Sequence, residues 1–192
     1  MITNTARSLH LTFTCTHFWE VSRLFFNIYR GPFKVSVTEI NRIRECLKPG
    51  QRLLGLDIGS KTIGLALSDV LGMLATPAET IRRVKFTKDV QRLKAIIAEE
   101  DVGGLILGLP VSMDGTEGPS CQSVRDFARN LSEIIDIPIA FWDERLSTAA
   151  VERVLIKEAD MTRKRRAQVV DKMAAAYILQ GALDAMAGMA SG

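Results

Sequence analysis

Cysteine and histidine are scarce in this chain of 192 residues, which contains three cysteines and two histidines. The cysteines Cys15, Cys46 and Cys121 lie far apart, and no two of them have the CxxC spacing. A disulfide framework or a zinc knuckle needs cysteines at short, repeated spacings. The pattern therefore argues against both kinds of site and fits a protein of the reducing cytoplasm.

Long apolar runs and a strong net charge are also missing. No stretch approaches the ~20 apolar residues that span a bilayer, so no membrane partner is expected. The formal net charge of +3 is uneven: residues 1–49 hold seven Lys/Arg and three Asp/Glu, whereas residues 50–192 hold eighteen and nineteen. The charge of the larger segment is therefore no independent evidence for nucleic-acid binding. A hydrophobic content of 47% excludes a disordered chain and, at this length, predicts one domain with a substantial core.

The stretch Arg52–Asp69, with the sequence RLLGLDIGSKTIGLALSD, is the most informative part of the chain. It predicts a buried strand, a tight turn at Gly59–Lys61 and a second strand, which together form a hairpin. Asp57 ends the first strand, and Lys61 lies in the turn beside it. Asp57 is either a satisfied turn carboxylate or a ligand for a hard cation or phosphate. The coincidence of Asp, Gly and Lys at one turn favours the ligand.

The rest of the chain alternates apolar runs with amphipathic stretches. Strands are predicted at Leu71–Ile81, Gly104–Leu109 and Pro138–Trp142, and Pro77 indicates a bend or an edge in the first of them. Helices are predicted from an N-cap at Thr87 to Glu100, over Val124–Ile135, after Ser147 and over Gln168–Met186. This order predicts an α/β domain with a mixed sheet. Since sites gather at the carboxyl ends of strands, Asp57, Gly108–Pro110 and Asp143–Glu144 should converge.

Residues 1–49 show no clean period, and we interpret them as an N-terminal extension of a domain that spans residues 50–192. Much of residues 1–36 is expected to be either a disordered tail or a translation-start artefact. Within the extension, Ile40, Ile43 and Leu47 have helical spacing and predict a short helix over residues 37–47.

Four stretches in order identify a family resemblance. DIGSKTIGLALSD resembles the first motif of the YqgF (RuvX-type) family, whose members resemble RuvC-type Holliday junction resolvases of the RNase H-like superfamily. The match continues through GLPVSMDGTEG at Gly108–Gly118, DERLST at Asp143–Thr148 and VVDKMAAAYILQ at Val169–Gln180. Each motif alone is weak, but four in the family's order are specific.

The resemblance implies a three-layer RNase H-like fold, with a five-stranded mixed sheet, an antiparallel second strand and helices on both faces. It implies Asp57, Glu144 and Asp171 as catalytic residues and as ligands of Mg²⁺ or Mn²⁺, with Asp143 in reserve. RuvC-type nucleases place an acid on the fourth strand, where this chain has Gly108, and Asp114 is either a compensating ligand or a turn residue. The expected substrate-binding residues are Lys61, Arg145, Arg163, Lys164, Arg165 and Arg166, the last four in a polar loop.

The function implied is a metal-dependent nuclease, a hydrolase that acts on phosphodiester bonds of structured nucleic acid. The family points to processing of the pre-16S rRNA end in ribosome biogenesis, with the precursor RNA and the ribosome as partners. Cleavage of Holliday junctions in DNA repair is an alternative, and a non-catalytic nucleic-acid- or ribosome-binding module is another. The stretch DIGSKTIG also resembles the first phosphate loop of actin-like ATPases, but those proteins bind ATP in a cleft between two such domains, and this chain has room for only one. The sequence leaves the oligomeric state open.

Overall fold

The computed structural model describes residues 37–143 and 163–189, with the backbone alone for residues 163–170. The strands are β1 (Val37–Thr38), β2 (Arg52–Ile58), β3 (Thr62–Ser68), β4 (Ala75–Arg82), β5 (Val102–Leu109) and β6 (Ile139–Asp143). The helices are α2 (Ile40–Ile43), the 3-10 turn η1 (Arg44–Cys46), α3 (Phe86–Glu99), α4 (Pro119–Ser132) and α6 (Arg163–Met189). None of the helices in these ranges combines the length and the apolar composition needed to cross a membrane.

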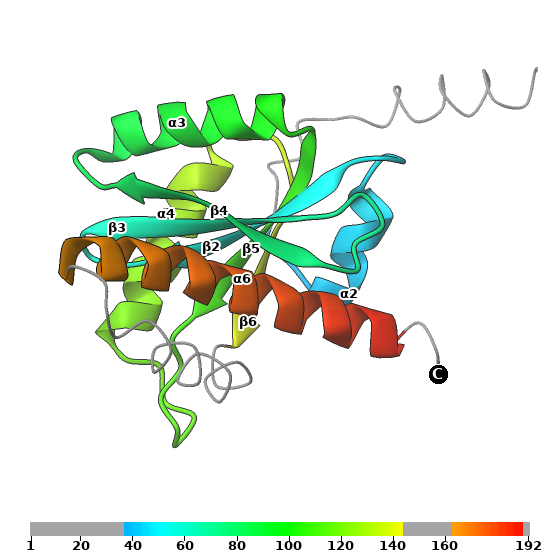
Figure 1. The fold of residues 1–192 in the computed structure, drawn as a ribbon. Coiled ribbons are helices and arrows are strands. Elements are labelled where there is room, and N and C mark those ends of the chain that lie inside the picture. The colour runs from blue at the N-terminus through cyan, green and yellow to red at the C-terminus, as the bar shows by residue number, and fades with distance from the viewer. Residues whose placement is uncertain (1–36, 144–162, 190–192) are drawn as a thin grey trace, which may run out of the picture. The chain divides into compact units, whose positions relative to one another are not determined.

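The strands form one mixed sheet in the order β1-β6-β5-β2-β3-β4 (Figure 1). β3 runs antiparallel to β2 and β4, and β5 runs parallel to β2 and β6. β2 to β6 confirm the predicted RNase H-like sheet with its antiparallel second strand, and β4, which contains Pro77, is the predicted edge. The sixth strand was not predicted, because β1 pairs with β6 through only two residues, too few to leave a sequence pattern.

The alternation of side chains along the strands builds two separate cores. Leu54 and Leu56 of β2 pack with α3 and α4 on one face of the sheet. Leu53 packs with α6 on the other, and Gly55 faces α6 as well, since a Cβ atom at Gly55 would lie 2.7 Å from the Cβ of Leu179. Helices therefore cover both faces, as predicted, and every odd-numbered residue of β2 from Leu53 onward faces α6.

Residues 37–46 contribute to the same core. Ile43 of α2 is fully buried with Leu53, and the short helix is followed by η1 rather than continuing to Leu47. The predicted helix over residues 37–47 is therefore wrong in its first two residues, which form β1, and in its length. The expectations for residues 1–36 lie outside the described residues.

Two further predictions need correction. α3 begins after Lys85, which is its N-cap, so Thr87 lies inside the first turn and does not cap it. α6 begins at Arg163, five residues before the predicted start, so the basic run Arg163–Arg166 forms its first turn and not a loop. Arg and Lys have high helix propensity, and the helix therefore extends through the run despite its like charges.

Candidate functional site

Asp57 lies at the carboxyl end of β2 and points toward α6. It continues the series Leu53, Gly55 on that face, and it is partly buried. Its register partner on β3 is Gly64, and the parallel pairing of Leu56 with Leu107 brings Gly108 of β5 beside it on the other side. Both neighbours of Asp57 on this face of the sheet are thus glycines, and the carboxylate has no side chain on either side of it within the sheet.

Asp171 comes to the same place from α6. A Cβ atom at Gly64 would collide with the backbone carbonyl oxygen of Asp171, so the helix backbone rests directly on β3 opposite Asp57. The helical spacing of Asp171, Ala175, Ile178 and Ala182 predicts one face that packs on the sheet, and in the structure Ala175 and Ala182 are fully buried and Ile178 is nearly so. The prediction that this face of the helix packs on the sheet is confirmed.

The two carboxylates interact through their charges. Burial, and to a lesser extent the negative charge of Asp171, together raise the pKa of Asp57 to about 6. Because the sequence predicts a helix that starts at Gln168, Asp171 could instead cap the N-terminus of that helix. Because α6 begins at Arg163, Asp171 lies more than two turns inside the helix, where the backbone amides already bond within the helix. Capping therefore does not explain an acid at this position.

The acids of β6 and of the loop after β5 are placed differently. Ala140 and Trp142 face α6, whereas Phe141 packs on the opposite core, so the alternation directs Asp143 away from the Asp57 face. Asp114 accepts hydrogen bonds from the backbone amide of Thr116 at 2.9 Å and from its hydroxyl at 2.7 Å. Of the two roles considered for Asp114 from the sequence, a metal ligand or a turn residue, the structure shows the turn residue.

Arg83 fixes the turn that follows Asp57. Its guanidinium donates to the carbonyl oxygen of Gly59 at 2.6 Å, and its backbone amide donates to that of Lys61 at 2.9 Å. The guanidinium also lies 3.8 Å from the buried carboxylate of Asp89 and 5.6 Å from the ring centre of Phe127. The hairpin turn is therefore tied to both α3 and α4 through one side chain.

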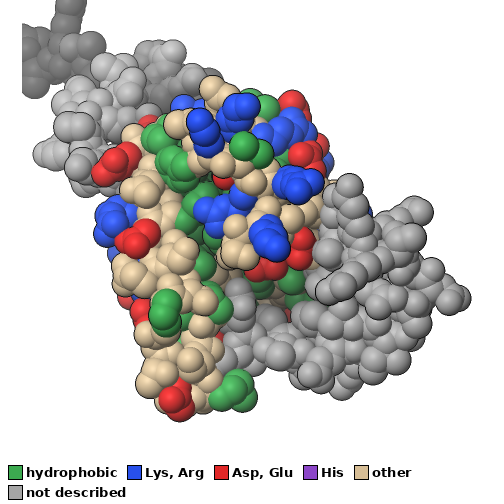
Figure 2. All heavy atoms as spheres, turned by 90° about the vertical axis from the view of Figure 1, so that its left-hand side faces the viewer, with side chains coloured by type: hydrophobic (Ala, Val, Ile, Leu, Met, Phe, Trp, Pro, Cys, Tyr) green, Lys and Arg blue, Asp and Glu red, His purple; other side chains and the backbone are tan. Residues whose placement is uncertain are grey.

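Basic side chains gather around this end of the sheet. Figure 1 shows the β2–β3 turn, the end of β4 and the starts of α3 and α6 together at the left, and Figure 2 faces that end and shows clustered Lys and Arg. The exposed basic residues of these elements are Lys61, Arg82, Lys85 and Lys88, which we call the basic strip. Among the described side chains, those of residues 37–143 and 171–189, none of the four forms an ion pair. The strip therefore carries positive charge that no described acid pairs with, at the end of the sheet where Asp57 lies.

Other predicted site residues are not placed. Glu144 and Arg145 lie outside the described residues, and of Arg163, Lys164, Arg165 and Arg166 only the helical backbone is described. In the described part of the chain no three acidic, histidine or cysteine side chains cluster as they would in a metal site. Of the predicted ligands, this part contains Asp57 and Asp171.

Sequence reasoning missed Gly64 and Arg83 as parts of the site. The signal for Gly64 was available, because a glycine inside a strand often marks a close approach of another backbone. Arg83 gave no distinct signal, since it is one of several basic residues close together along the chain, with Arg82 before it and Lys85 and Lys88 after it.

Comparisons with known proteins identify the family of this chain. A family model described as "RuvX: Holliday junction resolvase" matches residues 51–185. A "Putative pre-16S rRNA nuclease" of Paramagnetospirillum magneticum is 67% identical over 75% of this chain and 92% of its own length. A protein of the same description from Ruegeria sp. is 66% identical over 70% of this chain and 85% of its own. The structure of T. thermophilus RuvC in complex with a Holliday junction aligns with a TM-score of 0.44 at 16% identity, over 72% of this chain and 96% of the other. The family model covers residues 51–185, which include Asp57 and Asp171, and each of the two relatives covers more than two thirds of the chain; the chain therefore belongs to the RuvX family.

Proposed function

We propose that this chain is a metal-dependent nuclease that hydrolyses phosphodiester bonds at the end of a 16S ribosomal RNA precursor in the cytoplasm. The observation that carries the proposal is the meeting of Asp57 and Asp171, from a strand and a helix far apart in sequence, on one face of the sheet. The names of the two bacterial relatives support the choice of substrate.

The donor set suits Mg²⁺ or Mn²⁺. Two carboxylates held close enough to raise the pKa of one of them repel each other, and a hard divalent cation removes that repulsion. We propose Asp57, Asp171 and Glu144 as the ligands and catalytic residues. Of the two adjacent acids we choose Glu144, since the strand alternation turns Asp143 to the other face. When bound, the cation would lower the pKa of a water and relieve charge at the leaving oxygen.

The protein's own groups would bind and orient the substrate. Gly64 lets the α6 backbone bring Asp171 against Asp57, and the basic strip attracts the phosphates of the substrate strand. Arg83 holds the turn that connects Asp57 to Lys61, the strip residue next to it in the chain. Arg145 and the run Arg163–Arg166 are proposed as further substrate contacts.

Cleavage of branched DNA is the second candidate, and the description of the matching family model favours it. A non-catalytic binding module is the third, for which the glycine at position 108, where RuvC-type nucleases have an acid, is the argument. All three predict binding of nucleic acid, so only a cleavage assay separates them.

The test compares labelled 16S precursor RNA with a four-way DNA junction in the presence of Mg²⁺. The Asp57→Asn variant should lose more than about a hundredfold in rate, because even outer-shell partners of a metal contribute 10–100-fold. Asp114→Asn is the matched control, since Asn keeps the acceptor for Thr116, and its rate should equal that of the wild type. Equal turnover of Asp57→Asn and wild type would refute the site, and cleavage of the junction alone would assign the second function.

A further inference from the structure

A cluster of large apolar side chains is exposed on the β3–β4 turn, at the opposite end of the sheet from Asp57. Within residues 69–74, Val70, Leu71, Met73 and Leu74 are 53%, 71%, 69% and 61% exposed. Four large apolar side chains in five consecutive positions form a contiguous patch, whereas single exposed apolar residues are ordinary on protein surfaces. We call these four residues the apolar knob.

The backbone of the turn is fixed from within. The Asp69 carboxylate accepts hydrogen bonds from the backbone amides of Met73 at 2.7 Å and Leu74 at 3.0 Å. These amides, that of Leu74 first, hold the pKa of Asp69 below its ordinary value. The amide of Asp69 in turn donates to the carbonyl oxygen of Leu74 at 2.9 Å.

Two side chains from other elements hold the turn as well. Arg44 donates to the carbonyl oxygen of Gly72 at 2.5 Å. Gln180 of α6 donates to the carbonyl oxygen of Met73 at 3.0 Å and accepts from the amide of Ala75 at 2.9 Å. The polar groups thus order the backbone, while the knob side chains remain in water. Ordering a loop costs conformational entropy, and the exposed apolar side chains of this turn offset little of that cost, because they are not buried.

A cleft of about 660 Å³ opens beside the knob, and Val70 lies on its rim. Leu67, Pro77 and Ile96 give it apolar walls between the sheet and α3. Its charged lining consists of Arg52, Asp69, Glu79, Arg92, Glu99 and Glu100, which is four carboxylates against two guanidinium groups. The cleft is therefore net acidic.

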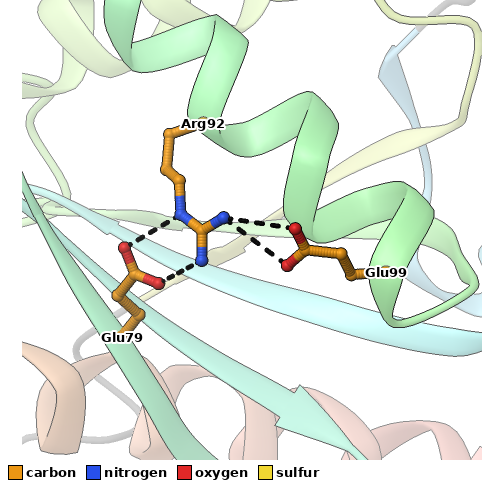
Figure 3. Close-up of polar contacts among 3 residues, drawn as sticks. All are labelled: Glu79, Arg92 and Glu99. Carbon is orange, nitrogen blue, oxygen red and sulfur yellow. Dashed lines mark hydrogen bonds and ion pairs between the residues drawn. The ribbon is translucent and has the colours of Figure 1, made fainter.

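The arginines of the cleft are occupied by its own acids. Arg92 donates to Glu79 at 2.6 and 3.1 Å and lies 3.5 Å from both oxygens of Glu99 (Figure 3). Arg52 donates to Glu100 at 3.1 Å. Since both guanidinium groups are already paired, neither is left to bind a phosphate, and the surplus charge that a partner meets is negative.

We propose that the apolar knob and the acidic cleft form a docking surface for a basic protein of the small-subunit precursor particle. The proposal rests on the proposed function, in which the substrate is a ribosomal RNA precursor. Proteins that coat RNA are rich in Lys and Arg because they neutralise phosphates, so their charge complements the cleft. Binding at this end leaves Asp57 and the basic strip, at the other end of the sheet, free to hold RNA.

The size of the knob agrees with a role as anchor. A stable interface buries ~800 Å² from each partner, over 20–30 residues a side, and four side chains are only its centre. Apolar anchors surrounded by a charged rim are the usual form of such a centre. RNA would be repelled by the acidic cleft and would gain little from aliphatic side chains.

The test is co-sedimentation of the full chain with purified small-subunit precursor particles, and separately with naked precursor RNA. In a Leu71→Ser/Met73→Ser variant, the Kd for particles should rise at least about tenfold, while the Kd for naked RNA should stay within about twofold. Ile134→Ser is the matched control, because Ile134 is an exposed apolar residue in the turn after α4, and it should change neither value.

A charge variant distinguishes a basic protein from RNA. Glu99→Lys reverses a half-exposed acid of the cleft while Glu79 keeps its bond to Arg92. Particle binding should weaken if the partner is basic and strengthen if it is RNA. Unchanged particle binding by the knob variant, an equal loss on naked RNA, or a knob-dependent dimer in sedimentation analysis would each overturn the proposal. Failure of the proposed function would instead appear as absent RNA cleavage by the wild type, with knob-dependent particle binding preserved.

Discussion

Replacing Asp57 by Asn should stabilise the folded protein at pH 8 when divalent cations are absent, although it removes activity. The pKa of Asp57 is raised from 3.8 to about 6 in the folded protein, chiefly by burial and further by Asp171. A shift of about two units, at ~1.36 kcal/mol each, corresponds to about 3 kcal/mol of destabilisation when the group is ionised. Asn has nearly the same shape and carries no charge, so the variant should recover up to this amount.

The sign of the pH dependence follows from the direction of the shift. The folded protein binds the Asp57 proton more tightly than the unfolded chain does, so the penalty is fully present above pH 6. It is relieved as the pH falls from 6 toward 3.8, where both states are protonated. The gain from Asp57→Asn should therefore be about 3 kcal/mol at pH 8 and should shrink steadily as the pH approaches 4.

The measurement is urea unfolding in EDTA at pH 8, 6 and 4.5. Asp136→Asn is the control: Asp136 is exposed, so the free energy of unfolding should change by less than about 0.5 kcal/mol at each pH. Mg²⁺ at a hundred times its Kd should stabilise the wild type by about 2.7 kcal/mol and leave Asp57→Asn nearly unchanged. A variant less stable than the wild type by the same amount at every pH would refute the reasoning, because it would show that the carboxylate is held by favourable contacts.

Three other substitutions test the parts of the site. Gly64→Ala places a methyl group against the Asp171 carbonyl, so it should lower the free energy of unfolding by about 1–3 kcal/mol through overpacking and should lower the cleavage rate. Gly188→Ala, with open space around it, is the control and should be neutral or slightly stabilising; equal stability of the two variants in urea unfolding would show that α6 does not rest on β3. Arg83→Gln releases the hairpin turn and should lower kcat with little change in KM. Arg82→Gln changes an exposed neighbour and should raise KM alone. The opposite pattern in steady-state cleavage would exclude a positioning role for Arg83. Replacing the run Arg163–Arg166 by Ala should raise KM and flatten the salt dependence of RNA binding, and an identical salt slope would count against phosphate contact.

The elements of the domain and the position of Asp57 could be predicted from the sequence, because each depends on local information. The apolar run from Leu53 to Ile58, interrupted only by Asp57, predicts a buried strand with an acid near its end, and the apolar run in β5 predicts a central parallel strand. The family motifs added Asp171, whose neighbours Ala175 and Ala182 already indicated a packing face.

The tertiary structure decided how these elements meet. Nothing local pairs Gly64 with the backbone of Asp171, which is more than a hundred residues away, or directs Asp143 away from Asp57. The start of α6 at Arg163 removed the capping role of Asp171, since a helix end depends on what the preceding residues can bond to. The sequence predicted a strand from Leu71, but residues 69–74 form the β3–β4 turn and β4 begins at Ala75. The ordered backbone of this turn depends on Arg44 and Gln180, and such long-range hydrogen bonds leave no periodic pattern in the chain.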